Sequence, residues 1–158
     1  MKIVVVNNYS FYYKMKRIID SSLFKTCHRY RYYKQNGASK SILQLASIEN
    51  RHFGMVMEYV VRDTLQMEMS NTKMHDAFFH GQRVEIKSSR IYLPHQDYKW
   101  SRLQPEKFDL AILVAVKPSG LSMYSLPSTV YENMHVKSVS LRHHANDITL
   151  IRHIKIEF

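Results

Sequence analysis

The clearest pattern in the chain is an unbroken apolar run, LAILVAVK, at residues 110–117. A run of this length without polar alternation predicts a β-strand that is buried on both faces. The turn residues 118–120 end it, and the apolar residues 121–126 predict a second strand. Residues 147–158 alternate well enough to predict a final strand, and the short run at 2–6 predicts another.

Helical patterns lie between these strands. The best one covers residues 47–66, with Ser47 as a candidate N-cap and Glu49 in the first turn, near the positive end of the helix dipole. Two shorter helices are predicted at 13–23 and from Pro127 to about residue 134. The apolar stripe expected to be buried on the 47–66 helix comprises Met55, Val56, Tyr59 and Val60.

Residues 73–93, KMHDAFFHGQRVEIKSSRIYL, predict a β-hairpin. A two-residue turn at His80-Gly81, where glycine supplies positive φ, pairs residues whose numbers add up to 161. Asp76 then lies opposite Glu85, and Lys87 projects from the same face as Glu85. A loop of three to five residues would shift this register. The reverse face of the hairpin is apolar and comprises Ala77, Phe79, Val84 and Ile86.

This hairpin also predicts chemistry. Like charges directly opposite each other destabilise an antiparallel pair, so Asp76 and Glu85 favour a cation between them. Hard carboxylate oxygens suit Mg²⁺, and Lys87 adds a fixed positive charge beside them. A core needs none of these three groups, and burying them unpaired would be costly.

Two further segments are rich in cations and aromatic rings. Residues 25–40 interleave Arg29, Arg31 and Lys34 with tyrosines, which suits contact with phosphates and stacking on bases. The alternative is a solvated loop whose tyrosines pack on the core. Residues 94–107 hold the single tryptophan of the chain and predict a polar loop or short helix at the rim.

The order of these elements predicts an α/β fold with a mixed central β-sheet flanked by helices. The chain has 158 residues, which fits one domain, 1–158, with its own core. Its formal net charge of +10 favours an anionic partner such as nucleic acid, although a basic surface without such a partner is the alternative.

Cys27 is the single cysteine, so the sequence offers no internal disulfide and no cysteine-based zinc site, and we expect an intracellular protein. The apolar start of the chain is too short for a signal peptide, and residues 110–116 are too few to cross a bilayer, so no membrane association is expected.

Asp76, followed after eight residues by Glu85-Ile86-Lys87, resembles the signature of the PD-(D/E)XK nuclease superfamily, which has the restriction-endonuclease-like fold. The resemblance implies a Mg²⁺ site, for which Mn²⁺ can substitute, formed by Asp76, Glu85 and the carbonyl of Ile86. It implies that Lys87 orients or activates the attacking water and stabilises charge on the phosphate.

Gly54 followed by Glu58 is similar to the pattern by which many of these nucleases add an acid to the metal site. Glu58 is therefore implied as a further catalytic and metal-binding residue, while the residues alone also allow a surface glutamate beside a glycine that admits another backbone. The resemblance covers roughly residues 47–126 and departs from the pattern at His75, where the family often has proline.

We therefore predict a metal-dependent endonuclease of double-stranded DNA, most like a small type II restriction enzyme acting as a homodimer. A structure-selective repair or recombination nuclease, acting on junctions or ends, is the first alternative. A nucleic-acid-binding protein without catalysis is the second. The basic residues expected to contact DNA are Arg29, Arg31, Lys34, Arg90, Lys99 and Arg102.

Overall fold

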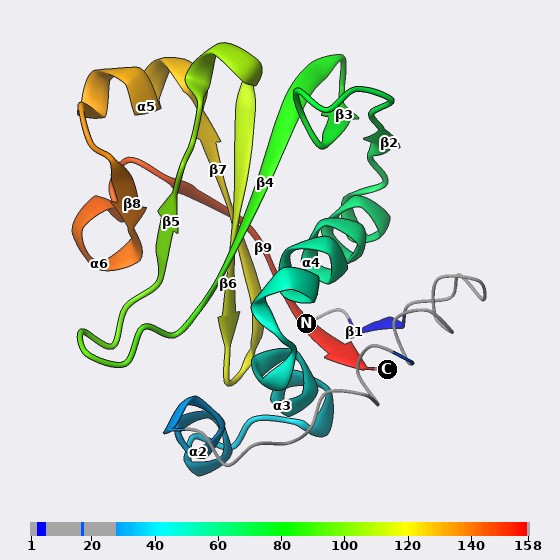
Figure 1. The fold of residues 1–158 in the computed structure, drawn as a ribbon, viewed down its shortest axis with the longest axis vertical. Helices are drawn as coiled ribbons and strands as arrows, with labels where there is room; N and C mark the ends of the chain where they lie inside the picture. Colours follow the sequence, from blue (N-terminus) through cyan, green and yellow to red (C-terminus); the bar gives the residue numbers. More distant parts are fainter. Residues whose placement is uncertain (1–2, 6–16, 18–27, 158) are drawn as a thin grey trace.

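The computed structural model describes residues 3–5, 17 and 28–157, and Figure 1 shows their arrangement. The helix predicted at 13–23 lies outside these residues except for Arg17. In chain order the elements are β1 (Ile3–Val5), α2 (His28–Gln35), α3 (Lys40–Ser47), α4 (Asn50–Leu65), β2 (Glu68–Met69), β3 (Ala77–Phe79), β4 (Gln82–Arg90), β5 (Lys99–Ser101), the 3₁₀ turn η1 (Pro105–Lys107), β6 (Leu110–Lys117), β7 (Gly120–Pro127), α5 (Ser128–Met134), β8 (Ser138–Ser140), α6 (Leu141–His144) and β9 (Thr149–Glu157).

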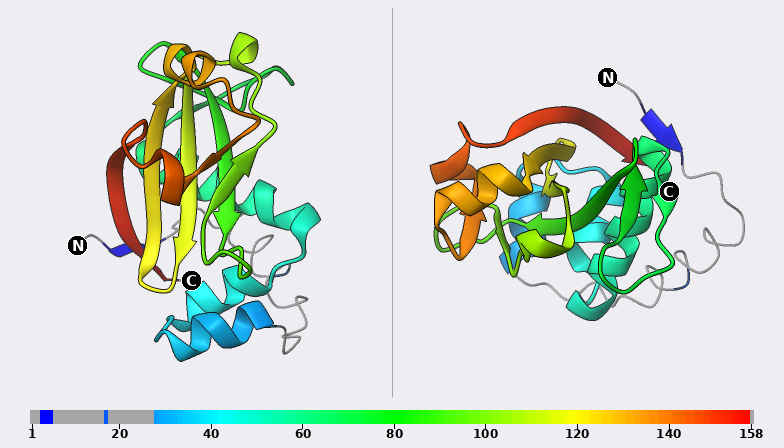
Figure 2. Two further views of the ribbon diagram at one scale, coloured as in Figure 1. Left: turned by 90° about the vertical axis from the view of Figure 1, so that its left-hand side faces the viewer. Right: turned by 90° about the horizontal axis from the view of Figure 1, so that it is seen from above.

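The described strands form a seven-stranded sheet in the order β1-β9-β7-β6-β4-β3-β2 and a two-stranded sheet of β5 and β8. β4 runs parallel to β6 and β1 parallel to β9, while the other neighbours in the large sheet are antiparallel. The sheet is curved, α4 packs against β4, and α3 packs against β6 (Figures 1 and 2). The predicted mixed α/β architecture is confirmed.

The central strand β6 is buried along residues 111–116, as its unbroken apolar sequence predicts. The predicted strands at 121–126 and 147–158 correspond to β7 and β9, and the short helix after Pro127 corresponds to α5. None of the helices in the described part of the chain has the length and apolar character that crossing a membrane requires.

The β3–β4 hairpin has the predicted register. Ala77 pairs with Val84 and Phe79 with Gln82, so the numbers of each pair add up to 161. The two turn residues, His80 and Gly81, have φ values of 49° and 79°, as a two-residue turn of type I′ requires. The local turn chemistry is therefore sufficient to set this pairing.

The helix predicted at 47–66 corresponds to α4, but its predicted start is wrong, because Ile48 has an extended backbone that ends α3 and separates it from α4. Ser47 is the last residue of α3 and donates its hydroxyl to the carbonyl of Leu43 at 2.7 Å, so it is not an N-cap. Glu49 is the N-cap residue of α4 and makes no capping bond with its side chain.

The predicted buried stripe of α4 is correct only in part. Val56 and Val60 are fully buried and Tyr59 is partly buried, whereas Met55 is 39% exposed. Phe53, Met57 and Val61 are buried as well. The face of α4 that packs on the core is therefore rotated away from Met55.

The segment 94–107 contains loop residues and the short helix η1, as predicted, but it also contains the strand β5, which the sequence pattern does not predict. Trp100 lies on β5, is 1% exposed and donates its indole N–H to the carbonyl of Val114 at 3.1 Å. Its neighbours Lys99 and Ser101 face solvent, so β5 alternates as a half-buried strand does. Burying the large indole outweighs the polar composition around it.

Candidate active site

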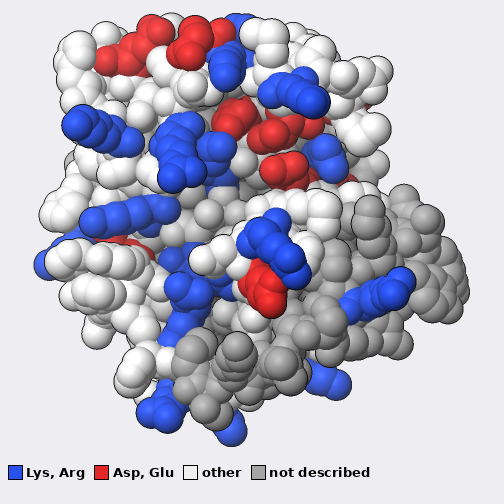
Figure 3. Space-filling model, viewed as in Figure 1, with Lys and Arg blue, Asp and Glu red and all other residues white. Residues whose placement is uncertain are grey.

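The predicted acids come from three neighbouring elements. Asp76 immediately precedes β3, Glu85 and Lys87 lie on β4, and Glu58 lies on α4, which packs against β4. Figure 3, drawn in the view of Figure 1, shows Asp and Glu side chains gathered over the region of β4, β3 and the adjacent end of α4, with Lys and Arg side chains around them. We call Glu58, Asp76, Glu85 and Lys87 the acid-lysine cluster.

Asp76 is held on β4 by hydrogen bonds. Its carboxylate Oδ2 accepts the backbone N–H of Ile86 at 2.7 Å, and its own backbone N–H donates to the carbonyl of Val84 at 2.9 Å. From α4, Arg62 Nη1 donates to the carbonyl of Asp76 at 3.4 Å. These contacts fix Asp76 beside Glu85, which confirms the geometry that the hairpin register predicts.

Glu85 and Lys87 form an ion pair in which Oε1 and Nζ are 2.6 Å apart. The side chains are only 16% and 33% exposed, so the pair is screened less than a surface pair would be. Burial raises the pKa of Glu85, the hydrogen bond from Lys87 opposes this, and the charge of Asp76 raises the pKa further.

Glu58 is partly buried, so it is not an ordinary surface glutamate. Burial, and secondly the charge of Asp76, raise its pKa from 4.5 to about 7, while Arg62 and Lys87 lower it. The carboxyl of Glu58 is therefore close enough to the hairpin for the charges of Asp76, Glu85 and Lys87 to shift its pKa. The structure brings the four predicted catalytic residues together.

The cluster offers carboxylate oxygens, which are the ligand type that Mg²⁺ prefers. Among the described residues, no group of three or more His, Cys, Asp or Glu side chains is already arranged around a common metal position. Glu85 is turned toward Lys87, and one oxygen of Asp76 accepts the N–H of Ile86. Mg²⁺ is commonly held by one or two carboxylates together with water and substrate phosphate, so this set fits.

The predicted DNA contacts fall on separate parts of the surface. Arg31 and Lys34 are exposed on α2, which lies at the end of the sheet away from the β3–β4 hairpin (Figure 1). Lys99 is exposed on β5 with its ammonium 5.2 Å from the ring centroid of Tyr92, and Arg102 is also exposed. Arg29 is only partly exposed.

Arg90 differs from the prediction, because it is 9% exposed and lies in the interior. Its guanidinium donates to the carbonyls of Ala46 and Ile48 and to the side chain of Asn50, and it lies 4.2 Å from the ring centroid of Phe53. These contacts join the end of α3 to the start of α4. Arg90 therefore holds the two helices together and is not the DNA contact that the sequence predicts.

Sequence reasoning missed two cations near the acids. Arg62 follows Glu58 by four residues on α4, and this spacing places both on one helix face. Lys107, in η1, contributes a charge that lowers the pKa of Glu85. The helical spacing could have identified Arg62, whereas Lys107 reaches Glu85 only through the tertiary fold.

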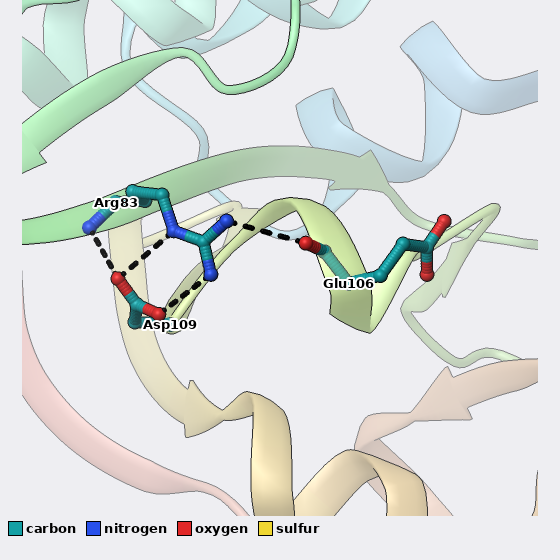
Figure 4. Close-up of polar contacts among 3 residues, drawn as sticks. All are labelled: Arg83, Glu106 and Asp109. Atoms are coloured by element: carbon teal, nitrogen blue, oxygen red, sulfur yellow. Dashed lines mark hydrogen bonds and ion pairs between the residues drawn. The ribbon is translucent and has the colours of Figure 1, made fainter.

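A second missed feature is an ion pair at the start of β4. Arg83 Nη2 lies 2.8 Å from Asp109 Oδ1 and Arg83 Nε lies 3.2 Å from Oδ2, while the third nitrogen donates to the carbonyl of Glu106 at 3.2 Å (Figure 4). Arg83 lowers the pKa of Asp109 to about 2 by these hydrogen bonds. The pair fixes β4 against β6 two residues before Glu85.

No protein-family model matches the chain, and no curated protein is significantly similar to it. Among solved structures it is similar to a bacterial homing endonuclease, I-Ssp6803I, with a TM-score of 0.49 and 13% identity over 59% of this chain and 78% of that one. It is also similar to a restriction endonuclease in complex with substrate DNA, with a TM-score of 0.40 and 14% identity over 80% of this chain and 68% of that one. These values are too low to assign a function to the chain.

Proposed function

We propose that the chain is a metal-dependent endonuclease that hydrolyses phosphodiester bonds of double-stranded DNA. The observation that carries the proposal is the acid-lysine cluster: Glu85 pairs with Lys87, Asp76 accepts the N–H of Ile86 between them, and the charges of all three groups act on the carboxyl of Glu58. Bringing acids together in a partly buried place costs folding stability. Packing alone does not explain why these acids lie together. Hydrolysis of an anionic substrate with a bound metal cation does explain it.

Glu58, Asp76, Glu85 and the main-chain oxygen of Ile86 would hold Mg²⁺ or Mn²⁺. A divalent ion bound there supplies Lewis-acid chemistry and lowers the pKa of a bound water. The hydrogen bond from Ile86 orients one oxygen of Asp76. Lys87 places a fixed positive charge beside the acids, where charge develops on the phosphate during hydrolysis.

The test is cleavage of duplex DNA by the wild type and by Glu85→Ala and Lys87→Ala. We expect each substitution to lower Mg²⁺-dependent cleavage by roughly 10²-fold or more, because each removes a group that acts on the transition state. Binding to the same duplex, measured without a divalent ion, should persist. Glu132→Ala, at an exposed position of α5, is the control that should cut like the wild type.

Wild-type rates for both cluster variants would contradict the proposal. If the wild type binds duplex DNA but never cuts it with Mg²⁺ or Mn²⁺, the chain is instead a nucleic-acid-binding protein. Salt-sensitive binding alone is compatible with both functions.

Within this proposal, the finer assignment is a small type II restriction enzyme that acts as a homodimer, which two-fold symmetric cleavage of a palindrome would require. Its support is the resemblance of Asp76 and Glu85-Ile86-Lys87 to the family signature. A plasmid digest separates this assignment from a structure-selective nuclease: discrete, reproducible fragments favour restriction, and cuts confined to branched or end-labelled substrates favour repair or recombination.

A further inference from the structure

Gly54 is a glycine for which the described part of the chain gives no structural reason. It lies inside α4, where glycine costs roughly 0.5–1 kcal/mol relative to alanine. Its φ is not positive, so any residue could adopt its backbone conformation. A Cβ built on Gly54 would meet no described heavy atom within 4 Å. The sequence-based expectation that a neighbouring backbone of this chain approaches Gly54 is therefore wrong for the described residues.

Gly54 adjoins the acid-lysine cluster. It precedes Glu58 by four residues, and residues three or four apart share a helix face, so Gly54 shares a face with Arg51 and Glu58. Arg62 continues the same stripe toward the hairpin, where it donates to the carbonyl of Asp76. Helix backbone that has no side chain, and no described heavy atom within 4 Å of its Cβ position, thus lies one turn from Glu58.

The charges beside this strip favour an anionic partner. Arg51 pairs with Glu49 at 3.0 Å, but both side chains are largely exposed, so the pair is weak and Arg51 can turn to a phosphate. Arg62 lies near the cluster. The chain as a whole carries a formal charge of +10. Two copies of a chain with this net charge repel each other, which disfavours a second copy as the occupant.

We infer that the sugar–phosphate backbone of the bound DNA passes over Gly54, in van der Waals contact with the helix backbone of α4. The inference rests on the proposed function, because it takes the DNA to be held at the acid-lysine cluster. The missing side chain lets the strand approach Glu58 closely, and Arg51 and Arg62 lie on the same stripe to balance its phosphates. Gly54 is thus a residue of the DNA interface.

The experiment compares Gly54→Ala and Gly54→Leu with the wild type in three measurements: urea unfolding, affinity for a duplex of about 25 base pairs without a divalent ion, and Mg²⁺-dependent cleavage. Alanine should raise the urea midpoint, because it favours the helix and its Cβ enters open space. Affinity should nevertheless fall about threefold for alanine and at least tenfold for leucine, as the larger side chain lifts the strand. Asn133→Leu, on the exposed surface of α5, is the size-matched control and should leave affinity unchanged.

The outcomes separate this inference from the proposed function. If the wild type cuts DNA and both Gly54 variants bind and cut equally well, the inference is overturned and the nuclease stands. If the wild type binds without cutting and the variants bind more weakly, the inference stands and the nuclease falls. A change in sedimentation with unchanged DNA affinity would make a second copy the occupant and overturn the inference, and a wild type that neither binds nor cuts DNA would overturn both.

Discussion

The folded structure disfavours the charged form of the Glu58 carboxyl. Burial and the nearby Asp76 raise its pKa to about 7, so the folded state holds a proton that the unfolded chain releases near its ordinary value of 4.5. Folding stability therefore falls as the pH rises from about 4.5 to about 7, and the full cost is present above that range. The uncharged amide of glutamine removes this cost.

Glu58→Gln is accordingly predicted to stabilise the metal-free protein at pH 8 by about 1–2 kcal/mol, after allowance for the partial exposure of the carboxyl, and to have little effect at pH 4. Urea unfolding of both proteins at the two pH values measures the difference. Glu132→Gln, on the exposed surface of α5, should have no effect at either pH. An equal effect of Glu58→Gln at pH 4 and pH 8 would show that Glu58 titrates normally.

The residues of the β3–β4 hairpin were the predictable part of this site. Two turn residues that accept positive φ set the pairing, and the period of two then places Asp76 beside Glu85. The location of Glu58 next to them follows from how α4 packs on β4, which no local pattern encodes. The family resemblance, not the spacing, is what suggested it.

At the scale of elements, the boundary between α3 and α4 shows why part of the fold could not be predicted from the sequence. Residues 40–65 have helix-forming sequence on both sides of Ile48, and neither proline nor glycine marks the break there. The break is stabilised from a distance by Arg90, whose guanidinium binds the carbonyls at the end of α3. A tertiary contact of this kind leaves no local signal, so the sequence alone predicts a surface cation at Arg90.

Arg90→Met is therefore predicted to lower the free energy of unfolding by about 2–4 kcal/mol, because it leaves the carbonyls of Ala46 and Ile48 without their donor. Arg90→Lys should recover only part of this loss, since an ammonium group cannot reproduce the planar donor set of arginine. Urea unfolding at pH 7 measures both variants. Arg102→Met, at an exposed position, is the matched control, and an equal effect of the two methionine variants would contradict this role of Arg90.

On the scale of the whole molecule, the basic residues of α2 and the acid-lysine cluster occupy different ends of the sheet. The acid-lysine cluster lies at the β3–β4 hairpin, while α2 carries Arg31 and Lys34 at the far end (Figure 1). The amphipathic character of α2 keeps it in place: Tyr33 is fully buried and accepts the backbone N–H of Ile91 at 3.1 Å. Exposed cations on an anchored helix suit phosphate contacts at a distance from the reacting bond.

A duplex that extends from the cluster to α2 would contact both, and its affinity should then depend on salt through each phosphate contact. For a duplex of about 25 base pairs, Arg31→Gln and Lys34→Gln are each predicted to reduce the slope of log affinity against log salt by about 0.9, the value for one lost contact. Lys137→Gln makes the same change of charge at an exposed position between α5 and β8, away from α2 (Figure 1), and should leave the slope unchanged. Equal slopes for the wild type and the α2 variants would place α2 outside the DNA path, and the exposed Lys99 and Arg102 would then be the next pair to measure in the same way.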